Sequence, residues 1–250
     1  MSNGNEDGKG SSVPEQLLGL EDVNDPRYQE KMLDFEIECN GGKGNPNACH
    51  HVGEYFSVIR DEHARAAKIY ENNCTSNGYG ASCFKLAKLY LSGKGVDNDD
   101  TKAGQYFKQA CDKDHLPACY HAGILKYLTA TSDEKNDKLS EADRRKLVKD
   151  SMKILQDTCE KGDVESCYVS ASQLIKPHAL SDLKKDAPKA LTYLHKGCDM
   201  NHPPSCYNLA VMYNKGAEGV PADQEKFKEY KEKTKSMYSL FGGLKGHKSA

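Results

Sequence analysis

The fold of this chain is decided by residues 81–115, which read ASCFKLAKLYLSGKGVDNDDTKAGQYFKQACDKDH. Apolar residues recur at three- and four-residue steps in both halves of this stretch, as on one face of an amphipathic helix. They are Phe84, Leu86, Ala87, Tyr90 and Leu91 in the first half, and Ala103, Tyr106, Phe107, Ala110 and Cys111 in the second. Gly93 and Gly95 end the first helix, and residues 98–100 (Asn-Asp-Asp) offer a cap for the second. Because such a hairpin cannot cover its own apolar faces, it predicts neighbours of the same kind.

The hairpin recurs along the chain, marked by ten cysteines that fall into pairs. The pairs are Cys39 and Cys49, Cys74 and Cys83, Cys111 and Cys119, Cys159 and Cys167, and Cys198 and Cys206. Four residues after the second cysteine of each pair stands a small residue, which lets a neighbouring helix approach closely. These small residues are Gly53, Ala87, Gly123, Ala171 and Ala210. Before the first cysteine of the later pairs, one helical face carries a small–large–large–small pattern, as in Ala66, Ile69, Tyr70 and Asn73.

When the repeats are aligned on their cysteines, these equivalent positions form columns. The columns predict an all-α fold, a right-handed α-solenoid of five helical-hairpin repeats stapled by disulfides. We expect a disordered acidic arm at 1–25, the solenoid at 26–240 and a frayed tail at 241–250. Within the solenoid we expect an N-terminal capping helix at about 27–40 and repeats at about 47–75, 81–112, 117–160, 165–199 and 204–236. Polar insertions at 129–145 and 176–188 lengthen the third and fourth repeats, and we expect them to be loops.

Each cysteine pair joins the end of one repeat's second helix to the start of the next repeat's first helix. The Cα separation of about 5–6 Å that a disulfide needs fits this junction, so we predict that all ten cysteines are disulfide-bonded. Reduced thiols acting as small apolar core residues are the alternative. Seven to nine residues separate the members of a pair, unlike the two to four residues within a zinc knuckle, and the sequence has no C-x-x-C redox motif.

Composition and cysteine chemistry limit the location and the partners. The formal net charge of −2 gives no basic field for nucleic acid, and there is no apolar run of about 18 residues for a membrane span. Disulfides require an oxidising compartment, yet residues 1–25 lack the features of a secretory signal or a matrix presequence. The mitochondrial intermembrane space is therefore expected. Unconventional secretion, a truncated chain and a cytosolic protein with reduced cysteines are the alternatives.

Longer motifs carry a family resemblance. The pattern A-S-C-F-K-L-A-x-L-Y-x-x-G-K-G-V followed by K-A-x-x-Y-F-K-x-A-C-D resembles the Sel-like repeat, a tetratricopeptide relative. With a cysteine at each outer end, it also resembles the bacterial beta-lactamase-named (hcp-like) repeat family. The segments FEIEC, DEHARAAKIYENNC, SCFKLAKLYLSGKG and ACYHAGIL together resemble the animal cytochrome c oxidase assembly factor seven family, over about residues 28–235. The long third and fourth turns and the acidic arm depart from that family.

The resemblance implies a protein of the intermembrane space that supports assembly of respiratory-chain complexes, chiefly cytochrome c oxidase, by binding client proteins. It implies the oxidative import machinery of that compartment as a further partner. The alternative that it implies is a thiol–disulfide reductase, haem-binding in some proposals, acting on copper-delivery proteins. Haem is implied by the resemblance only. A non-enzymatic scaffold is the first of the two hypotheses.

The residues themselves indicate no catalytic site. S-x-x-K occurs at 82–85, 132–135 and 181–184, but the S-D-N and K-T-G partners of a beta-lactamase are absent from the sequence. Histidines are scattered at positions 50, 51, 115, 121, 178, 195 and 202, where packing or surface roles are favoured over haem or metal ligation. With all cysteines paired, a reductase must use one of the repeat disulfides. The Cys39–Cys49 loop is the longest and the richest in glycine, so it is predicted to be the most labile.

Overall fold

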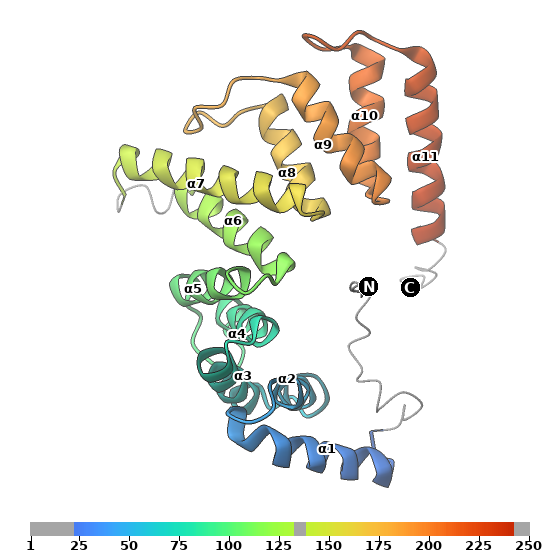
Figure 1. Ribbon diagram of the computed structural model, residues 1–250. Coiled ribbons are helices and arrows are strands. Elements are labelled where there is room, and N and C mark those ends of the chain that lie inside the picture. The colour runs from blue at the N-terminus through green and yellow to red at the C-terminus, as the bar shows by residue number, and fades with distance from the viewer. Residues whose placement is uncertain (1–22, 133–138, 243–250) are drawn as a thin grey trace, which may run out of the picture. The chain divides into compact units, whose positions relative to one another are not determined.

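The computed structural model describes residues 23–132 and 139–242, and for residues 240–242 it describes the backbone alone (Figure 1). These residues are helical apart from turns and one isolated bridge between Ala217 and Val220, so the all-α prediction is confirmed. The chain divides into two compact units, residues 1–115 and 116–250. Most of the predicted arm and residues 243–250 of the predicted tail lie outside the described residues.

Unit 1 is built from a lone helix and two hairpins. Its elements are α1 (Pro26–Cys39), η2 (Asn40–Gly42), α2 (Pro46–Glu54), η3 (Tyr55–Ile59), α3 (His63–Asn77), α4 (Gly80–Ser92) and α5 (Asp100–Cys111). Helices α2 and α3 form one hairpin and α4 and α5 the next, while α1 packs on α2 and α3 packs on α4. The π-helical turn η3 continues α2 and buries two aromatic rings, Tyr55 and Phe56.

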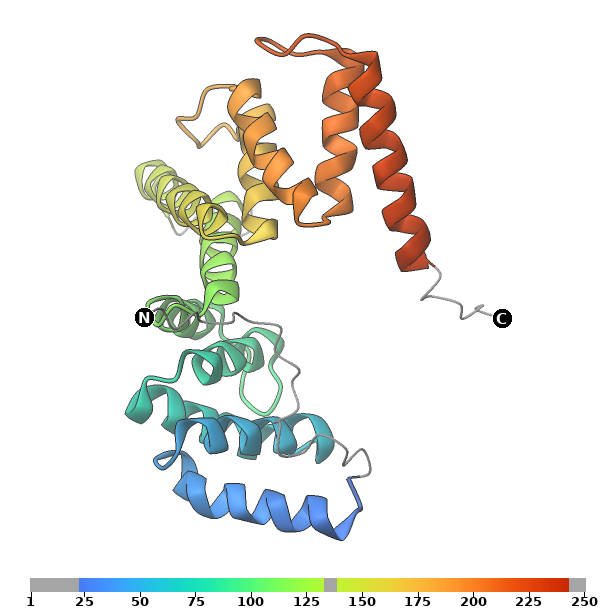
Figure 2. The ribbon, with the colours of Figure 1, turned by 45° about the vertical axis from the view of Figure 1, so that its right-hand side comes forward.

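Unit 2 holds three hairpins. Its helices are α6 (Leu116–Thr131), α7 (Glu141–Glu160), α8 (Val164–Ile175), α9 (Ala187–Asp199), α10 (Pro203–Lys215) and α11 (Gln224–Gly242). They pair as α6 with α7, α8 with α9 and α10 with α11, and α7 packs on α8 as α9 packs on α10. Figures 1 and 2 both show α10 and α11 side by side and running in opposite directions. Because α11 continues through Gly242, the first two residues of the predicted frayed tail are helical.

The turn inside a hairpin closes in the same way in α4–α5, α8–α9 and α10–α11. An aspartate precedes the second helix, and its carboxylate accepts a hydrogen bond from a backbone N–H in the first turn of that helix. Its own N–H donates to a carbonyl near the end of the first helix. The aspartates are Asp99, Asp186 and Asp223, at N···O distances of 3.0, 3.0 and 2.8 Å. The cap predicted within residues 98–100 is therefore Asp99, and the two equivalent caps were not predicted.

The predicted helix faces form the core. Ala66, Ile69, Tyr70 and Asn73 of α3 are all buried, each with at most 9% of its surface exposed. The small residue predicted at the facing position is required at Gly53, because a Cβ there would lie 2.7 Å from Cζ of the Tyr70 ring. The columns derived from the cysteines therefore identify which sides of the helices meet.

The two insertions are more ordered than the predicted loops. Helix α6 extends to Thr131 and α7 begins at Glu141, so helix replaces both ends of the 129–145 segment. Residues 133–138 lie outside the described part. In the 176–188 segment, Leu180 is 9% exposed and packs into a cluster with Val148 and Leu155 of α7. An apolar anchor thus fastens the second insertion to the preceding hairpin.

Candidate functional site

The structure brings together the cysteines that the sequence paired. The Cα atoms are 4.5 Å apart in Cys39–Cys49, 4.8 Å in Cys74–Cys83, 4.6 Å in Cys159–Cys167 and 4.8 Å in Cys198–Cys206. Cys111 and Cys119 are also disulfide-bonded, and no free cysteine occurs among the described residues. Each of the first four bridges fastens the end of one helix to the start of the next. The stapled architecture is therefore confirmed.

The bridge predicted to be most labile is buried, although Cys39 lines a cavity of about 240 Å³. Cys39 and Cys49 are 1% and 0% exposed, and the N–H of Gly42 points at the Cys39 sulfur from 3.1 Å. The backbone of Gly44 and Asn45 also bonds back to the last turn of α1. The glycines therefore shape a tight turn, and nothing in this turn indicates a loose loop. Cys74 is more exposed, at 4%, and it lines an open cavity of about 390 Å³ together with Cys83 and Lys113.

Beneath the surface of α2 and α4, buried side chains form a hydrogen-bonded network. Asn73 is fully buried, and its Nδ2 donates to the Pro46 carbonyl at 2.9 Å and to Ser82 Oγ at 2.8 Å. Asn77 donates to Asn73 Oδ1 at 2.8 Å, and His50 Nδ1 lies 3.2 Å from Ser82 Oγ. Ser82 itself is fully buried, so the S-x-x-K match at 82–85 offers no exposed nucleophile.

Charged groups lie above this network. Lys85 Nζ is 2.8 Å from Glu54 Oε1, while His50 Nε2 and His51 Nδ1 lie 3.9 and 3.6 Å from the same carboxylate. Burial pushes the pKa of Glu54 up, but the neighbouring histidines and Lys85 outweigh it and lower that pKa to about 2. Burial lowers the pKa of His50 to about 4, against the pull of Glu54. At neutral pH the site therefore holds an ionised carboxylate, a lysine and a neutral buried histidine.

We name this group the unit 1 polar cluster; its members are His50, His51, Glu54, Tyr70, Asn73, Ser82 and Lys85. Sequence reasoning did not assemble it, although it noted two of the histidines. The available signal was Asn73, an amide in a column where the later repeats carry Ala110, Thr158 and Gly197. An amide in an otherwise small or weakly polar buried column requires partners, and Ser82 supplies one.

The buried histidine makes the stability of unit 1 depend on pH. The folded pKa of His50, about 4, is below its usual value of 6.5. The unfolded chain therefore binds the extra proton, so this stability is present above about pH 6.5 and is lost as the pH falls towards 4. We expect a loss of about 2 kcal/mol between pH 7 and pH 5. Urea unfolding at each pH measures it, and His50→Gln should flatten the profile. An unchanged slope in that variant would contradict the assignment.

The buried hydroxyl of Tyr70 provides a test of how the cluster's polar groups affect stability. Its hydroxyl is buried and has no hydrogen-bond partner among the described residues, and burial raises its pKa far above the usual value. Removing an unsatisfied buried hydroxyl relieves a desolvation cost. We expect Tyr70→Phe to leave the free energy of unfolding unchanged or raise it by about 1 kcal/mol. Chemical denaturation measures this, and a loss above about 1 kcal/mol would show that the hydroxyl has a partner in solution.

Two of the histidines have ring nitrogens that are engaged by hydroxyl groups. His50 is held by Ser82, and both ring nitrogens of His195 lie 3.2 Å from tyrosine hydroxyls, those of Tyr213 and Tyr230. Three cavities, which lie beside Cys39, Cys74 and Pro188, have no histidine in their walls. Over the described ranges, no group of three His, Cys, Asp or Glu side chains is placed to hold a metal ion. No chemistry is therefore assigned to haem or to a metal here.

The hairpins match a known repeat. The Sel1 repeat model matches residues 80–115, 179–202 and 203–226. The chain carries Sel1 repeats. The first match spans the α4–α5 hairpin and the other two cover α9 and α10 with their flanking turns, so the repeat prediction is confirmed.

Similar proteins extend this likeness over most of the chain. Cytochrome c oxidase assembly factor 7 of Xenopus tropicalis is 27% identical over 234 residues, which cover 90% of this chain and 95% of the relative. The Homo sapiens protein of that name is 27% identical and covers 84% of this chain and 73% of the relative. The Drosophila melanogaster homolog is 25% identical, and the match covers 82% of this chain and 85% of the relative.

A solved structure shows the same Sel1 fold. The crystal structure of a Sel1 repeat protein from Oxalobacter formigenes superposes with a TM-score of 0.64, covering 88% of this chain and 81% of that one, at 19% identity. This likeness concerns the fold alone. Within the described ranges, the structure has no helix long and apolar enough to cross a membrane.

Proposed function

We propose that this protein is a disulfide-stapled scaffold that supports assembly of cytochrome c oxidase by binding client proteins. The observation that carries the proposal is the match to proteins named cytochrome c oxidase assembly factor 7, across 90% of this chain and 95% of the relative. A repeat array suits this role, because each hairpin contacts only its neighbours and leaves long surfaces for a partner.

The experiment is deletion of the protein in its own cells, followed by native-gel analysis of the respiratory complexes. Assembled cytochrome c oxidase should fall severalfold, and the full chain should restore it. Normal oxidase levels in the deletion strain would refute the assembly role. Capture of the oxidised protein from mitochondria, with chemical cross-linking, then identifies the clients.

The proposed location is the mitochondrial intermembrane space, with its oxidative import machinery as a further partner. Its support is chemical, since the cysteines of the described residues are bonded in disulfides and such bridges persist only in oxidising compartments. Protease protection after rupture of the outer membrane tests the location, and alkylation mobility shifts count the thiols. A cytosolic protein with ten alkylated thiols would contradict both the location and the bridges.

Within the scaffold we assign client recognition to the unit 1 polar cluster. Lys85 and Glu54 carry opposite charges at 36% and 15% side-chain exposure, and the buried Asn73–Ser82 network fixes the helices beneath them. Fixed polar groups on rigid helices select a partner at low entropic cost. Lys85→Glu should reduce client capture at least tenfold, while Lys196→Glu on α9, a lysine that is 37% exposed and likewise paired with a glutamate, should not. Equal client capture by both variants would show that the binding surface lies outside the unit 1 polar cluster.

The second candidate function is thiol–disulfide exchange, and the structure favours a different bridge from the one predicted. Cys74–Cys83 lines the cavity of about 390 Å³ beside Lys113, so an incoming thiolate can approach one sulfur, form a mixed disulfide and release the other as a thiolate. Differential alkylation in graded glutathione buffers tests this idea. Cys74 and Cys83 should be alkylated first. Simultaneous reduction of all bridges would argue against exchange at this one.

A further inference from the structure

Helix α1 differs from the other cysteine-bearing second helices at two exposed positions. Six and two residues before the first cysteine of the later pairs, the side chains are polar: Lys68 and Asn72, Gln105 and Gln109, Lys153 and Asp157, Thr192 and Lys196. In α1 the same positions hold Leu33 and Ile37, which are 58% and 70% exposed. A helix that caps an array is expected to turn a polar face to water. Two aliphatic side chains one helical turn apart therefore indicate a contact surface.

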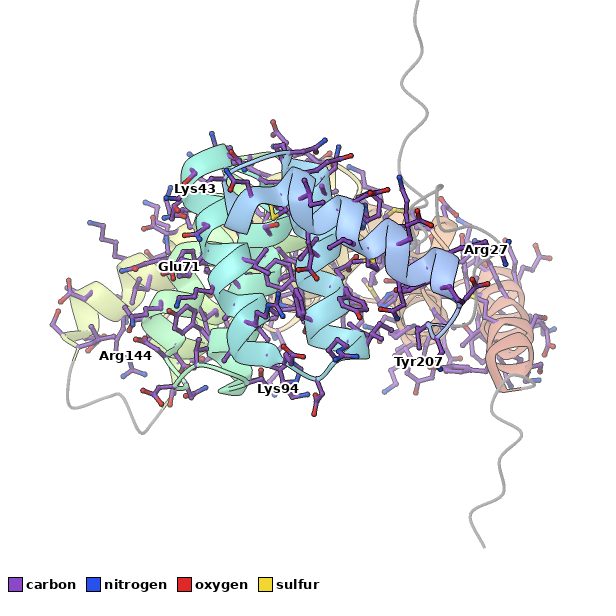
Figure 3. All side chains as sticks on the ribbon, turned by 90° about the horizontal axis from the view of Figure 1, so that it is seen from below. Arg27, Lys43, Glu71, Lys94, Arg144 and Tyr207 are labelled. Atoms are coloured by element: carbon purple, nitrogen blue, oxygen red, sulfur yellow. A yellow bond between two sulfur atoms is a disulfide. The ribbon has the colours of Figure 1, made fainter. Side chains whose placement is uncertain are left out.

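An acidic stripe lies beside these two residues. Glu30, Asp34 and Glu38 follow at four-residue steps and are exposed. Helix α1, marked in Figure 3 by Arg27 near its start and Lys43 just beyond its end, carries four acidic and two basic residues. A surface with two aliphatic side chains and three carboxylates fits a basic helix that also presents an apolar residue.

Helix α11 of this same chain has that character. Lys228, Lys231, Lys235 and Tyr238 lie at steps of three, four and three residues, which is one helical stripe, and all four are exposed. Tyr238 is 55% exposed. Between residues 224 and 239 the helix carries five lysines against three glutamates, and one of these, Glu232, accepts from Lys235. The lysines span about 10 Å along the helix and the acids of α1 about 12 Å.

In the C-terminal hairpin, an aromatic ring is exposed at a position where two inner repeats bury part of theirs. In two inner repeats the ring after the second cysteine contacts a histidine that precedes the next hairpin, at 4.8 Å between Phe84 and His115 and 5.2 Å between Tyr168 and His202. The equivalent Tyr207, labelled in Figure 3, is 57% exposed. Among the described residues, Tyr207 therefore has no histidine ring contact like those of Phe84 and Tyr168.

We propose that the outer face of α1 binds α11 of a second copy of this chain. The contact is heterologous, because α1 of one molecule meets a different helix, α11, of the other. One helix pair buries less than the roughly 1,200 Å² of a standard interface, so the association is weak and reversible. Opposite charges line it, so salt weakens it.

Sedimentation velocity over a hundredfold range of concentration tests the proposal. The mean mass should rise with concentration at low salt and fall when salt is added. Leu33→Lys with Ile37→Asn, which installs residues found at these positions in α3, should weaken association at least tenfold and leave the unfolding curve unchanged. Leu128→Lys, at a 54% exposed leucine of α6, is the matched control and should associate like the parent.

Mixing variants separates this arrangement from other dimers. Lys231→Glu with Lys235→Glu damages only the α11 surface, and the Leu33→Lys, Ile37→Asn variant damages only the α1 surface. Each variant alone should be monomeric, whereas their mixture should form a one-to-one pair and nothing larger. A two-fold dimer that survives in either variant alone would overturn the proposal.

Isotope labelling identifies which copies touch. Carbodiimide cross-linking of a mixture of ¹⁴N- and ¹⁵N-labelled protein should give α1–α11 peptides that contain both isotopes. Peptides with a single isotope throughout would mean that the two helices meet within one chain. That result, or a parent protein that stays monomeric at low salt and high concentration, would overturn the proposal. Neither result bears on the assembly function.

Discussion

Replacing Cys198 and Cys206 together by alanine is expected to lower the free energy of unfolding of unit 2 by about 2–5 kcal/mol. Both residues are 0% exposed and join the end of α9 to the start of α10. Closing a loop of this length removes freedom from the unfolded chain worth about 2.5 kcal/mol, and the loss of two buried sulfurs adds a packing cost.

Reductant provides the control that separates a bridge from two packed thiols. Urea unfolding followed by circular dichroism is measured with and without dithiothreitol, and hydrogen exchange assigns the change to α9 and α10. The parent protein should lose stability on reduction. If instead its unfolding were insensitive to reductant, and the variant lost only about 1 kcal/mol, the cysteines would be acting as small apolar residues.

The sequence contained enough information for the repeats and much less for the polar cluster. The cysteine columns identified the packed faces because each column recurs in several hairpins, so that Gly53 and Tyr70 were both assigned to the interior. The burial of Cys39–Cys49 was not predictable, because it depends on backbone bonds from Gly44 and Asn45 to the end of α1. Such bonds depend on the path of the turn, which composition does not specify.

The ends of the insertions were misjudged for a related reason. Residues 129–145 are polar, and polarity predicts a loop when it is considered alone. Ser140, however, accepts a hydrogen bond from the N–H of Asp143 and starts α7 early. The cap at Ser140 and the apolar residues that follow it favour a helix more strongly than the polar composition favours a loop. In the same way, Leu180 marked an anchored segment within a stretch that otherwise appears solvated.

Gly53→Ala is expected to destabilise unit 1 by about 2 kcal/mol, although alanine favours a helix over glycine by about 1 kcal/mol. The added Cβ would lie 2.7 Å from two atoms of the Tyr70 ring, which is 1% exposed and has little room to move. Overpacking of a filled core costs about 1–3 kcal/mol and occasionally more, so the clash outweighs the gain in helix propensity. Chemical denaturation of the full chain measures the difference.

Gly123→Ala is the matched control, since Gly123 occupies the same position in another repeat. Its Cβ would lie 2.9 Å from Cδ2 and Cγ of Leu155, a fully buried side chain, and the approach is less close than that of the Gly53 Cβ to the Tyr70 ring. A cost of about 1 kcal/mol, smaller than that of Gly53→Ala, is therefore expected. Tyr70→Leu, which removes the ring, should reduce the cost of Gly53→Ala, with a coupling of about 1–2 kcal/mol in the double-mutant cycle. Equal costs for the two glycine variants and no coupling to Tyr70 would show that the α2–α3 contact is not limited by this ring.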